Sequence, residues 1–274
     1  MRVIVTDAEV TMSDVLSLRM TMTGPLADGT ELVLRHRGTG TERRVRLGHE
    51  TGHRHEEGVP GAAGDTAIAV PLGGLTLSPG RWDAYLLQDG PRTRLRSTDP
   101  GFSLDGLDAY ALSRRTLAYR AYRTRNGYLA LKVTEADPVA DVRAVWFREG
   151  RFEVTGLLAY TGLDDDDSRR RAHIELRHGG DRAAMVTAAA TVQGVRFHAA
   201  LSLCDVIAAA PDYEGLWEPV LEVYGLDAPL PLGARVDDVE GRRRRVHYPA
   251  TSVDGVPIRP CYTATDDLRL EVGG

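Results

Sequence analysis

Alternating apolar and polar residues run through most of the chain. In residues 15–22, VLSLRMTM, the apolar Leu16 and Leu18 share one face, while Ser17 and Arg19 share the other. This period of two is typical of a strand with one buried face. It also predicts strands over residues 31–37, 67–72, 82–88, 128–133, 142–147, 151–159, 172–178, 194–203, 217–224 and 268–272. Because only residues 205–210 favour a helical turn, the pattern predicts an all-β chain.

Short motifs recur in the same order along the chain. The matched pairs are 34–36 (LRH) with 176–178, 80–83 (GRWD) with 215–218 (GLWE), and 120–133 with 259–272. Their offsets of 142, 135 and 139 residues are nearly constant, and small loop insertions explain the drift. Each half also has turn residues every 8–12 positions, which is typical of a β-sandwich. We therefore predict a tandem duplication of an immunoglobulin-like β-sandwich, with domains at 1–136 and 137–274.

The repeat predicts two matched cores. Residues present in both halves should serve the fold, and residues present in one half are better functional candidates. The predicted core positions are Leu16, Leu18, Leu34, Trp82, Leu129 and Leu131 in the first half, and Phe152, Val154, Leu176, Trp217, Leu268 and Leu270 in the second. His36 and His178 lie in phase with apolar neighbours, so we expect them to bond to the backbone rather than to catalyse.

Composition narrows the classes of function. The 274 residues carry a net charge of −5, which argues against a general nucleic-acid binder. Lys132 is the only lysine, so a Schiff base or a phosphate-binding lysine loop is not expected, and the arginine bias suggests a GC-rich, actinobacterial genome. No signal peptide is expected from the first residues, and no apolar run is long enough to predict a membrane span. Cys204 and Cys261 are expected to be reduced, buried thiols in a cytoplasmic protein.

The largest asymmetry between the halves is an insertion of about 13 residues in the first, judged from the longer spacing of its matched strands. It contains GHETGHRHEEG at residues 48–58. His49, His53 and His55, with neighbouring glutamates, supply ligands suited to a transition metal. The flanking glycines instead favour a solvated loop without a rigid ligand shell. Both interpretations remain open.

Two charged runs also mark the second half. Residues 164–167 are four aspartates, but they lack the spacing of a calcium-binding EF-hand loop. The arginines at 169–171 favour a self-paired, exposed hairpin loop. Residues 242–245 are four arginines, which favour a solvated surface but would also suit a phosphate-bearing ligand.

No catalytic or cofactor motif is present: the chain has no G-x-S-x-G, no CxxC and no glycine-rich phosphate loop in the required context. No cofactor is expected. The segments GRWDAYL…RTRLR and YRTRNGYLALKV resemble β-sandwich accessory domains of actinobacterial glycosyltransferases and CDP-glycerol glycerophosphotransferases, which build teichoic-acid-type cell-wall polymers. The resemblance implies an accessory or binding role. It transfers no catalytic residue, because the catalytic domain of that family is missing here.

Two functional hypotheses follow. The first is a non-catalytic binding or assembly module for a glycan, a polyol-phosphate polymer or a partner transferase, in cell-wall polymer or natural-product biosynthesis. The alternative is a small-molecule biosynthetic enzyme with its site between the two sandwiches. Residues found in one half only are the first candidates for ligand contact: His53, His55, Glu56, Trp146, Tyr160, Asp212 and Tyr213.

Overall fold

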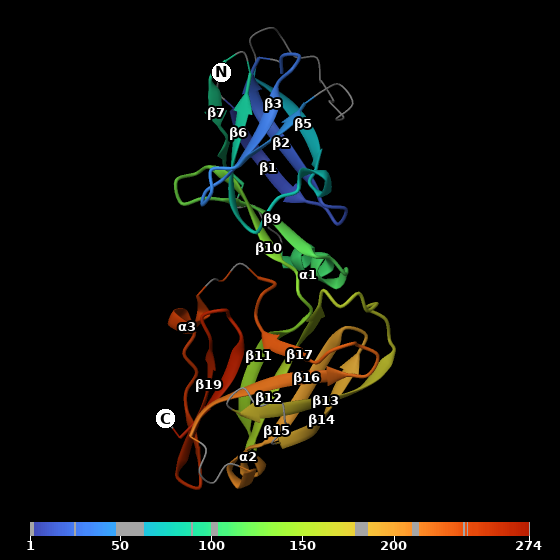
Figure 1. Cartoon of the computed structure of the whole chain (residues 1–274), viewed down its shortest axis with the longest axis vertical. Helices are drawn as coiled ribbons and strands as arrows, with labels where there is room; N and C mark the ends of the chain where they lie inside the picture. The colour runs from blue at the N-terminus through green and yellow to red at the C-terminus, as the bar shows by residue number, and fades with distance from the viewer. Residues whose placement is uncertain are drawn as a thin grey trace. The chain divides into compact units, whose positions relative to one another are not determined.

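The computed structural model divides the chain into two compact units (Figure 1). Unit 1 comprises Met1–Tyr110 and Arg115–Ala136, and unit 2 comprises Ala111–Arg114 and Asp137–Gly274. Strand residues make up 58% of the described chain and helical residues 9%, so the predicted β-rich fold is confirmed. The structure describes residues 3–24, 26–47, 63–88, 90–99, 104–178, 186–209, 214–237, 239 and 241–273.

Within its described residues, unit 1 forms two sheets. The first has the strand order β5 (Ala63–Pro71), β2 (Val15–Thr23), β1 (Val3–Val10) and β8 (Arg96–Ser97). The second has the order β4 (Glu42–Arg46), β3 (Glu31–His36), β6 (Gly80–Leu87), β10 (Leu129–Glu135) and β9 (Leu117–Arg123), with β7 (Arg92–Arg94) paired to β6. The remaining elements are the 3-10 turn η2 (Gly73–Leu75) and the helix α1 (Leu104–Leu112).

One hydrophobic cluster fills unit 1 and draws on both sheets. In β2 the alternating sequence buries every second side chain, including Leu16 and Leu18, and leaves Arg19 exposed. Burying these side chains removes apolar surface from water, which is the main stabilising term of folding. The predicted first core is confirmed, because all of its members are buried: Leu16, Leu18, Leu34, Trp82, Leu129 and Leu131.

Trp82 anchors this core and shows why His36 lies beside it. His36 faces Trp82 across the β3–β6 pair, with the ring centroids 5.0 Å apart in an edge-on arrangement. The His36 ring places Nε2 3.2 Å from the Pro79 carbonyl oxygen, and its Nδ1 accepts the Thr39 backbone N–H at 3.0 Å. The expected backbone-bound histidine is therefore confirmed at this position.

Unit 2 forms one sheet that closes on itself (Figure 1). The strand order is β13 (Arg169–His178), β14 (Val186–Gln193), β15 (Arg196–Ser202), β12 (Arg151–Ala159), β11 (Val139–Arg148), β17 (Leu230–Gly233), β16 (Gly215–Val223), β20 (Leu268–Val272), β19 (Val256–Tyr262) and β18 (Thr251–Val253). Because β16 also pairs with β13, the first seven strands make a closed barrel, and the last three extend the sheet from β16.

The interior of unit 2 is a second hydrophobic cluster. The members predicted from the sequence are all fully buried: Phe152, Val154, Leu176, Trp217, Leu268 and Leu270. In β13 the buried residues are Ile174 and Leu176, so the alternate residues between and beside them lie on the outer face. This alternation presents a polar surface on the outside of the barrel.

The strand pairings of unit 1 recur in unit 2 in the same chain order. The β1–β2, β2–β5, β3–β4, β3–β6, β6–β10 and β9–β10 pairs correspond to β11–β12, β12–β15, β13–β14, β13–β16, β16–β20 and β19–β20. In each unit one tryptophan faces a histidine on one side and a leucine on the other: Trp82 faces His36 and Leu131, and Trp217 faces His178 and Leu270. These pairings define register counterparts between the units.

The structure departs from the predicted pair of open sandwiches in unit 2. There β14 pairs with β15 through the two-residue turn Gly194 and Val195, and this pair helps to close the barrel. The strand predicted over 194–203 therefore begins two residues later, at Arg196. The predicted helical turn is present as α2 (Leu203–Ala209), whereas the helix α1 was not predicted, because its LDGLDAYAL sequence has no clear apolar stripe.

Two further predictions concern the cysteines and membrane-spanning segments. Cys204 and Cys261 are both free, as predicted, although Cys204 is exposed rather than buried. In the described part of the chain, no helix has the length and apolar character needed to cross a membrane.

Candidate functional site

A band of linked charged side chains crosses the outer face of unit 2. On β20, Arg269 donates to the Glu218 carboxylate of β16 at 3.0 Å. Glu218 faces Arg177 of β13 in the strand register. Arg177 in turn donates through two nitrogens to Glu175, which lies 3.1 Å from His173. Antiparallel pairing thus aligns residues that are far apart in sequence into one continuous polar surface.

One end of this band opens into a pocket of about 500 Å³. Its walls come from β16, β19 and β20, together with the segment 243–248 beside β19. Leu216 lines it with a side chain that remains 52% exposed, and the Tyr248 and Tyr262 rings lie with centroids 6.2 Å apart on another wall. Such a mixture of apolar surface and a few polar groups is typical of small-molecule sites.

The arginine run over α3 (Arg242–Arg245) serves two purposes. Arg242 is buried, and its guanidinium donates to the carbonyl oxygens of Ala234 and Val239 at 2.9 and 2.8 Å and pairs with Asp237. It therefore anchors the segment to the barrel. Arg243 is exposed, lines the pocket, and donates to no described side chain or backbone group. The solvated surface favoured by the sequence is therefore wrong for Arg242 and agrees with the exposed Arg243.

The pocket is lined by more positive than negative side chains. Its lining includes three arginines, Arg243, Arg259 and Arg269, and one acidic residue, Glu271. Arg259 donates through Nε to Glu271 at 3.0 Å and also through a terminal nitrogen. This pair neutralises the single carboxylate of the lining. In a chain of net charge −5, the pocket is a local site of positive charge.

The two weak acids of the pocket wall stay protonated at neutral pH. Burial, followed by the negative charge of Glu271, raises the pKa of the Cys261 thiol. Burial, and next the neighbouring Tyr248, raises the pKa of Tyr262. A protonated thiol is a poor nucleophile. These groups therefore act as neutral hydrogen-bonding or packing surface in this pocket.

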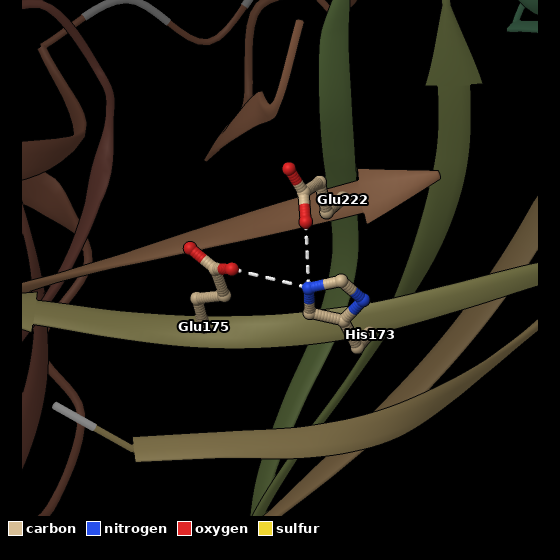
Figure 2. Close-up of side chains that lie close together, drawn as sticks. All are labelled: His173, Glu175 and Glu222. Carbon is tan, nitrogen blue, oxygen red and sulfur yellow. Dashed lines mark hydrogen bonds and ion pairs between the residues drawn. The ribbon is translucent and has the colours of Figure 1, made fainter. Parts of the chain in front are cut away.

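A second cluster lies farther along the same outer face, on β13 and β16 (Figure 2). The His173 Nε2 atom lies 3.1 Å from Glu175 Oε1 and 2.6 Å from Glu222 Oε2. Within the described residues, this is the group whose histidine and carboxylate atoms converge closely enough to hold a metal ion. Burial raises the pKa of Glu175, but hydrogen bonds from Arg177 and His173 lower it by more, so the carboxylate is ionised.

The structure does not bring the described candidates from the sequence together. Trp146 is 40% exposed on β11, near the turn that joins β11 to β12. Tyr160 is buried just after the other end of β12, and its N–H donates to the Ala111 carbonyl oxygen at 2.7 Å. The two therefore lie at opposite ends of one hairpin, roughly 20 Å apart by strand rise.

The remaining sequence candidates lie outside the described residues and stay predictions. They are His49, His53, His55, Glu56, Asp212 and Tyr213.

The aspartate run pairs differently from the sequence prediction. Asp165 forms its ion pair with Arg196 of β15, at 3.1 Å, rather than with the adjacent arginines. Asp166 accepts hydrogen bonds from Ser168. The loop is exposed, as predicted, and one of its four carboxylates pairs with an arginine of a neighbouring strand.

Sequence reasoning missed the pocket residues of β19 and β20. In the sequence repeat, Arg269 and Glu271 match Ala130 and Lys132 of the first half, and this difference in charge is the signal that could have identified them. The outward phase of these positions follows from the alternation in LRLEV, so the sequence contained the necessary information. The position of the 243–248 segment beside β19 could not be predicted from this alternation.

No protein-family profile matches the chain, and no curated protein matches its sequence. Two solved structures of S. aureus TarS show a structural likeness. For the TarS fragment 217–571, the identity is 12%, the alignment covers 73% of this chain and 54% of that one, and the TM-score is 0.35. For a second TarS structure these values are 12%, 72%, 34% and 0.34. The chain thus spans about half or less of these structures, and scores this low support no functional assignment.

Proposed function

We propose that this protein is a non-catalytic binding module and that the unit 2 pocket takes an anionic carbohydrate or polyol-phosphate chain. The observation that carries the proposal is the lining of this pocket. Three arginines line a space of about 500 Å³ in an acidic chain; Arg259 and Arg269 are paired with Glu271 and Glu218, and Arg243 has no described carboxylate partner. Guanidinium groups bind phosphate oxygens bidentately, which gives both affinity and orientation.

Different side chains of the pocket contact different parts of the proposed ligand. Arg243 offers a guanidinium with no described partner, so it is the primary phosphate contact. Arg259 contributes the donors that its pair with Glu271 does not use. The exposed Leu216 and the two tyrosine rings offer apolar surface to the C–H faces of a sugar or polyol. An alternating polyol-phosphate chain presents both kinds of group.

A binding role fits the chemistry of the pocket better than a catalytic one. Cys261 and Tyr262 are held in their protonated forms, and Glu271 is engaged by Arg259. None of the three is therefore poised as a nucleophile or general base. The motif resemblance to accessory domains of cell-wall polymer transferases agrees with a binding module that presents such a polymer to a partner transferase, and we place this role in the cytoplasm.

We further propose that the two units arose by tandem duplication of an immunoglobulin-like sandwich, with domains at 1–136 and 137–274. The recurrence of the strand pairings and of the Trp–His contact supports this origin. In this view unit 1 keeps the two-sheet form of the ancestor. Unit 2 has become a closed barrel, and the pocket lies on the strands that extend from it.

Calorimetric titration with glycerol-phosphate oligomers, inorganic phosphate and neutral maltotriose tests the proposed ligand class. We expect the full chain to bind the oligomers more tightly than phosphate, and phosphate more tightly than maltotriose. Arg243→Ala should weaken oligomer binding by about tenfold or more, because a charge-assisted hydrogen bond is lost.

Arg244→Ala is the matched control, because it removes the same charge from the same helical turn but from a residue that does not line the pocket. Equal losses in the two variants would indicate diffuse electrostatic attraction and contradict a built site. If maltotriose binds and the two phosphate probes do not, the proposed anionic ligand is wrong and the pocket takes a neutral glycan.

A further inference from the structure

The strand register of β13 and β16 brings three metal-ligating side chains to one point. His173 faces Glu222 directly across the pair, and Glu175 lies two residues along β13 on the same outer face. Figure 2 shows both carboxylates turned toward the same ring nitrogen of His173. Convergence of one imidazole and two carboxylates is independent of the arginine-lined pocket, because none of the three residues lines it.

The separations are close to those of ligands on a single small cation. Zinc bonds to nitrogen and oxygen are about 2.0–2.2 Å long, which places neighbouring ligand atoms of a tetrahedral site roughly 3.3–3.6 Å apart. The distance of 3.1 Å from His173 to Glu175 lies just below this range, and the 2.6 Å distance to Glu222 is shorter still. Both must lengthen when an ion enters, and the His173 and Glu222 side chains are 39% and 44% exposed, which leaves them room to move.

Arg177 fixes the orientation of Glu175. Its Nε and a terminal nitrogen donate to Glu175 Oε2 at 3.1 and 2.6 Å, which leaves Oε1 directed at His173. The Glu175 side chain is only 13% exposed, so this carboxylate has little freedom to turn. Outer groups that orient a ligating carboxylate are a regular feature of metal sites.

The fold does not require this cluster. By strand register, the counterparts of His173, Glu175 and Glu222 in unit 1 are Glu31, Val33 and Leu87. Val33 is an apolar, buried residue, and the β3–β6 pair nevertheless forms with the same register. By contrast, the register positions of Arg177 and Glu218 hold Arg35 and Asp83 in unit 1, so these opposite charges are shared and the ligand set is not.

We propose that His173, Glu175 and Glu222 bind a first-row divalent cation of the zinc type on the outer face of unit 2. Imidazole nitrogen and carboxylate oxygen are ligands that such cations accept. Three protein ligands leave at least one coordination position for water or for an oxygen of a bound ligand. Arg177 acts as a positioning residue that holds Glu175 in the ligating geometry.

Zinc titration of the full, untagged chain tests this site. The chain is first treated with a chelator, and the titration is done in a His49→Ala/His53→Ala/His55→Ala background that removes the other predicted metal ligands. We expect one zinc ion to bind. His173→Ala should abolish this binding, Glu222→Gln should weaken it by at least tenfold, and Arg177→Gln should weaken it by about tenfold.

X-ray absorption of the zinc-loaded background variant should show one imidazole nitrogen with carboxylate oxygens. Thermal melting of each variant in chelator verifies the fold, and Glu222→Gln tests the site even if His173→Ala does not fold. Three outcomes overturn the proposal: no zinc binding by either the unsubstituted chain or the background variant, binding that survives both His173→Ala and Glu222→Gln, or binding by the unsubstituted chain that the triple histidine substitution removes. The first two would leave His173 as the centre of an ion-paired triad, and the third would assign the ion to His49, His53 and His55.

Discussion

Units 1 and 2 share their strand pairings but differ in how their sheets end. In unit 2 the β14–β15 connection is a two-residue turn, which forces the two strands to pair and completes the barrel. In unit 1 the equivalent strands β4 and β5 are separated by residues 47–62, and they belong to different sheets. The sheets also differ at β17, which pairs with both β11 and β16, whereas in unit 1 two separate strands, β8 and β7, pair with β1 and β6. The closed barrel of unit 2 thus differs from the two sheets of unit 1 at both of these places.

The two units also differ in what their outer faces carry. Their cores keep the same residue classes at matched positions, whereas the surfaces around them have diverged. Ala130 and Lys132 of unit 1 correspond to Arg269 and Glu271 of unit 2, beside the pocket. Unit 2 thus carries charged side chains on its outer face at positions where the sheet imposes only a strand conformation. Three further predictions test this comparison.

Truncating the paired tryptophans should have the largest effect. Trp82→Ala and Trp217→Ala each empty a fully buried position and should lower the free energy of unfolding of their own unit by about 3–5 kcal/mol. Urea denaturation measures the loss. If one substitution costs less than about 1 kcal/mol, the two tryptophans are not equivalent core anchors.

Alanine substitution of the matched glycines should reveal a smaller difference in stability between the two units. Gly80 and Gly215 both have positive φ, of 139° and 136°, so alanine at either position costs about 1–3 kcal/mol in backbone strain. A Cβ at Gly80 would also lie 2.1 Å from His36 Nε2, whereas at Gly215 the nearest atom, His178 Nε2, is 3.7 Å away.

Gly80→Ala should therefore destabilise the protein by about 1–3 kcal/mol more than Gly215→Ala, because of overpacking. Thermal and urea unfolding of the two variants provide the comparison. Equal losses would mean that His36 moves aside without cost.

The smallest expected effect concerns Glu175, whose counterpart is the apolar Val33. Its folded pKa lies below the ordinary value of 4.5, so its ionised form stabilises the native state above that pH. This stabilisation is lost as the pH falls through the lower, folded pKa. Glu175→Gln should thus lower stability at pH 7 by about 1 kcal/mol or less, and this deficit should shrink as the pH falls through the folded pKa. Urea denaturation in chelator over a series of decreasing pH values measures this, and a deficit that does not change with pH would point to packing instead.

Local alternation was sufficient to predict the cores. A strand shows its buried face as every second residue, so Leu16, Leu18, Phe152 and Val154 could be assigned without coordinates, and the predicted strands 151–159 and 268–272 agree with β12 and β20. His36 could be interpreted in the same way, because its phase with Leu34 at the end of a strand indicated a histidine bound to the backbone rather than a catalyst. These features depend only on residues close in sequence.

The candidate sites depended on contacts that local patterns do not encode. His173 and Glu222 are 49 residues apart, and only the β13–β16 register makes them neighbours. Arg243 reaches β19 because the buried Arg242 holds its segment, and this could not be predicted from four identical arginines. Sequence alone determined which faces are buried, since burial follows a local period. Tertiary structure decided which outer residues meet, since strand order and register are set by long-range pairing.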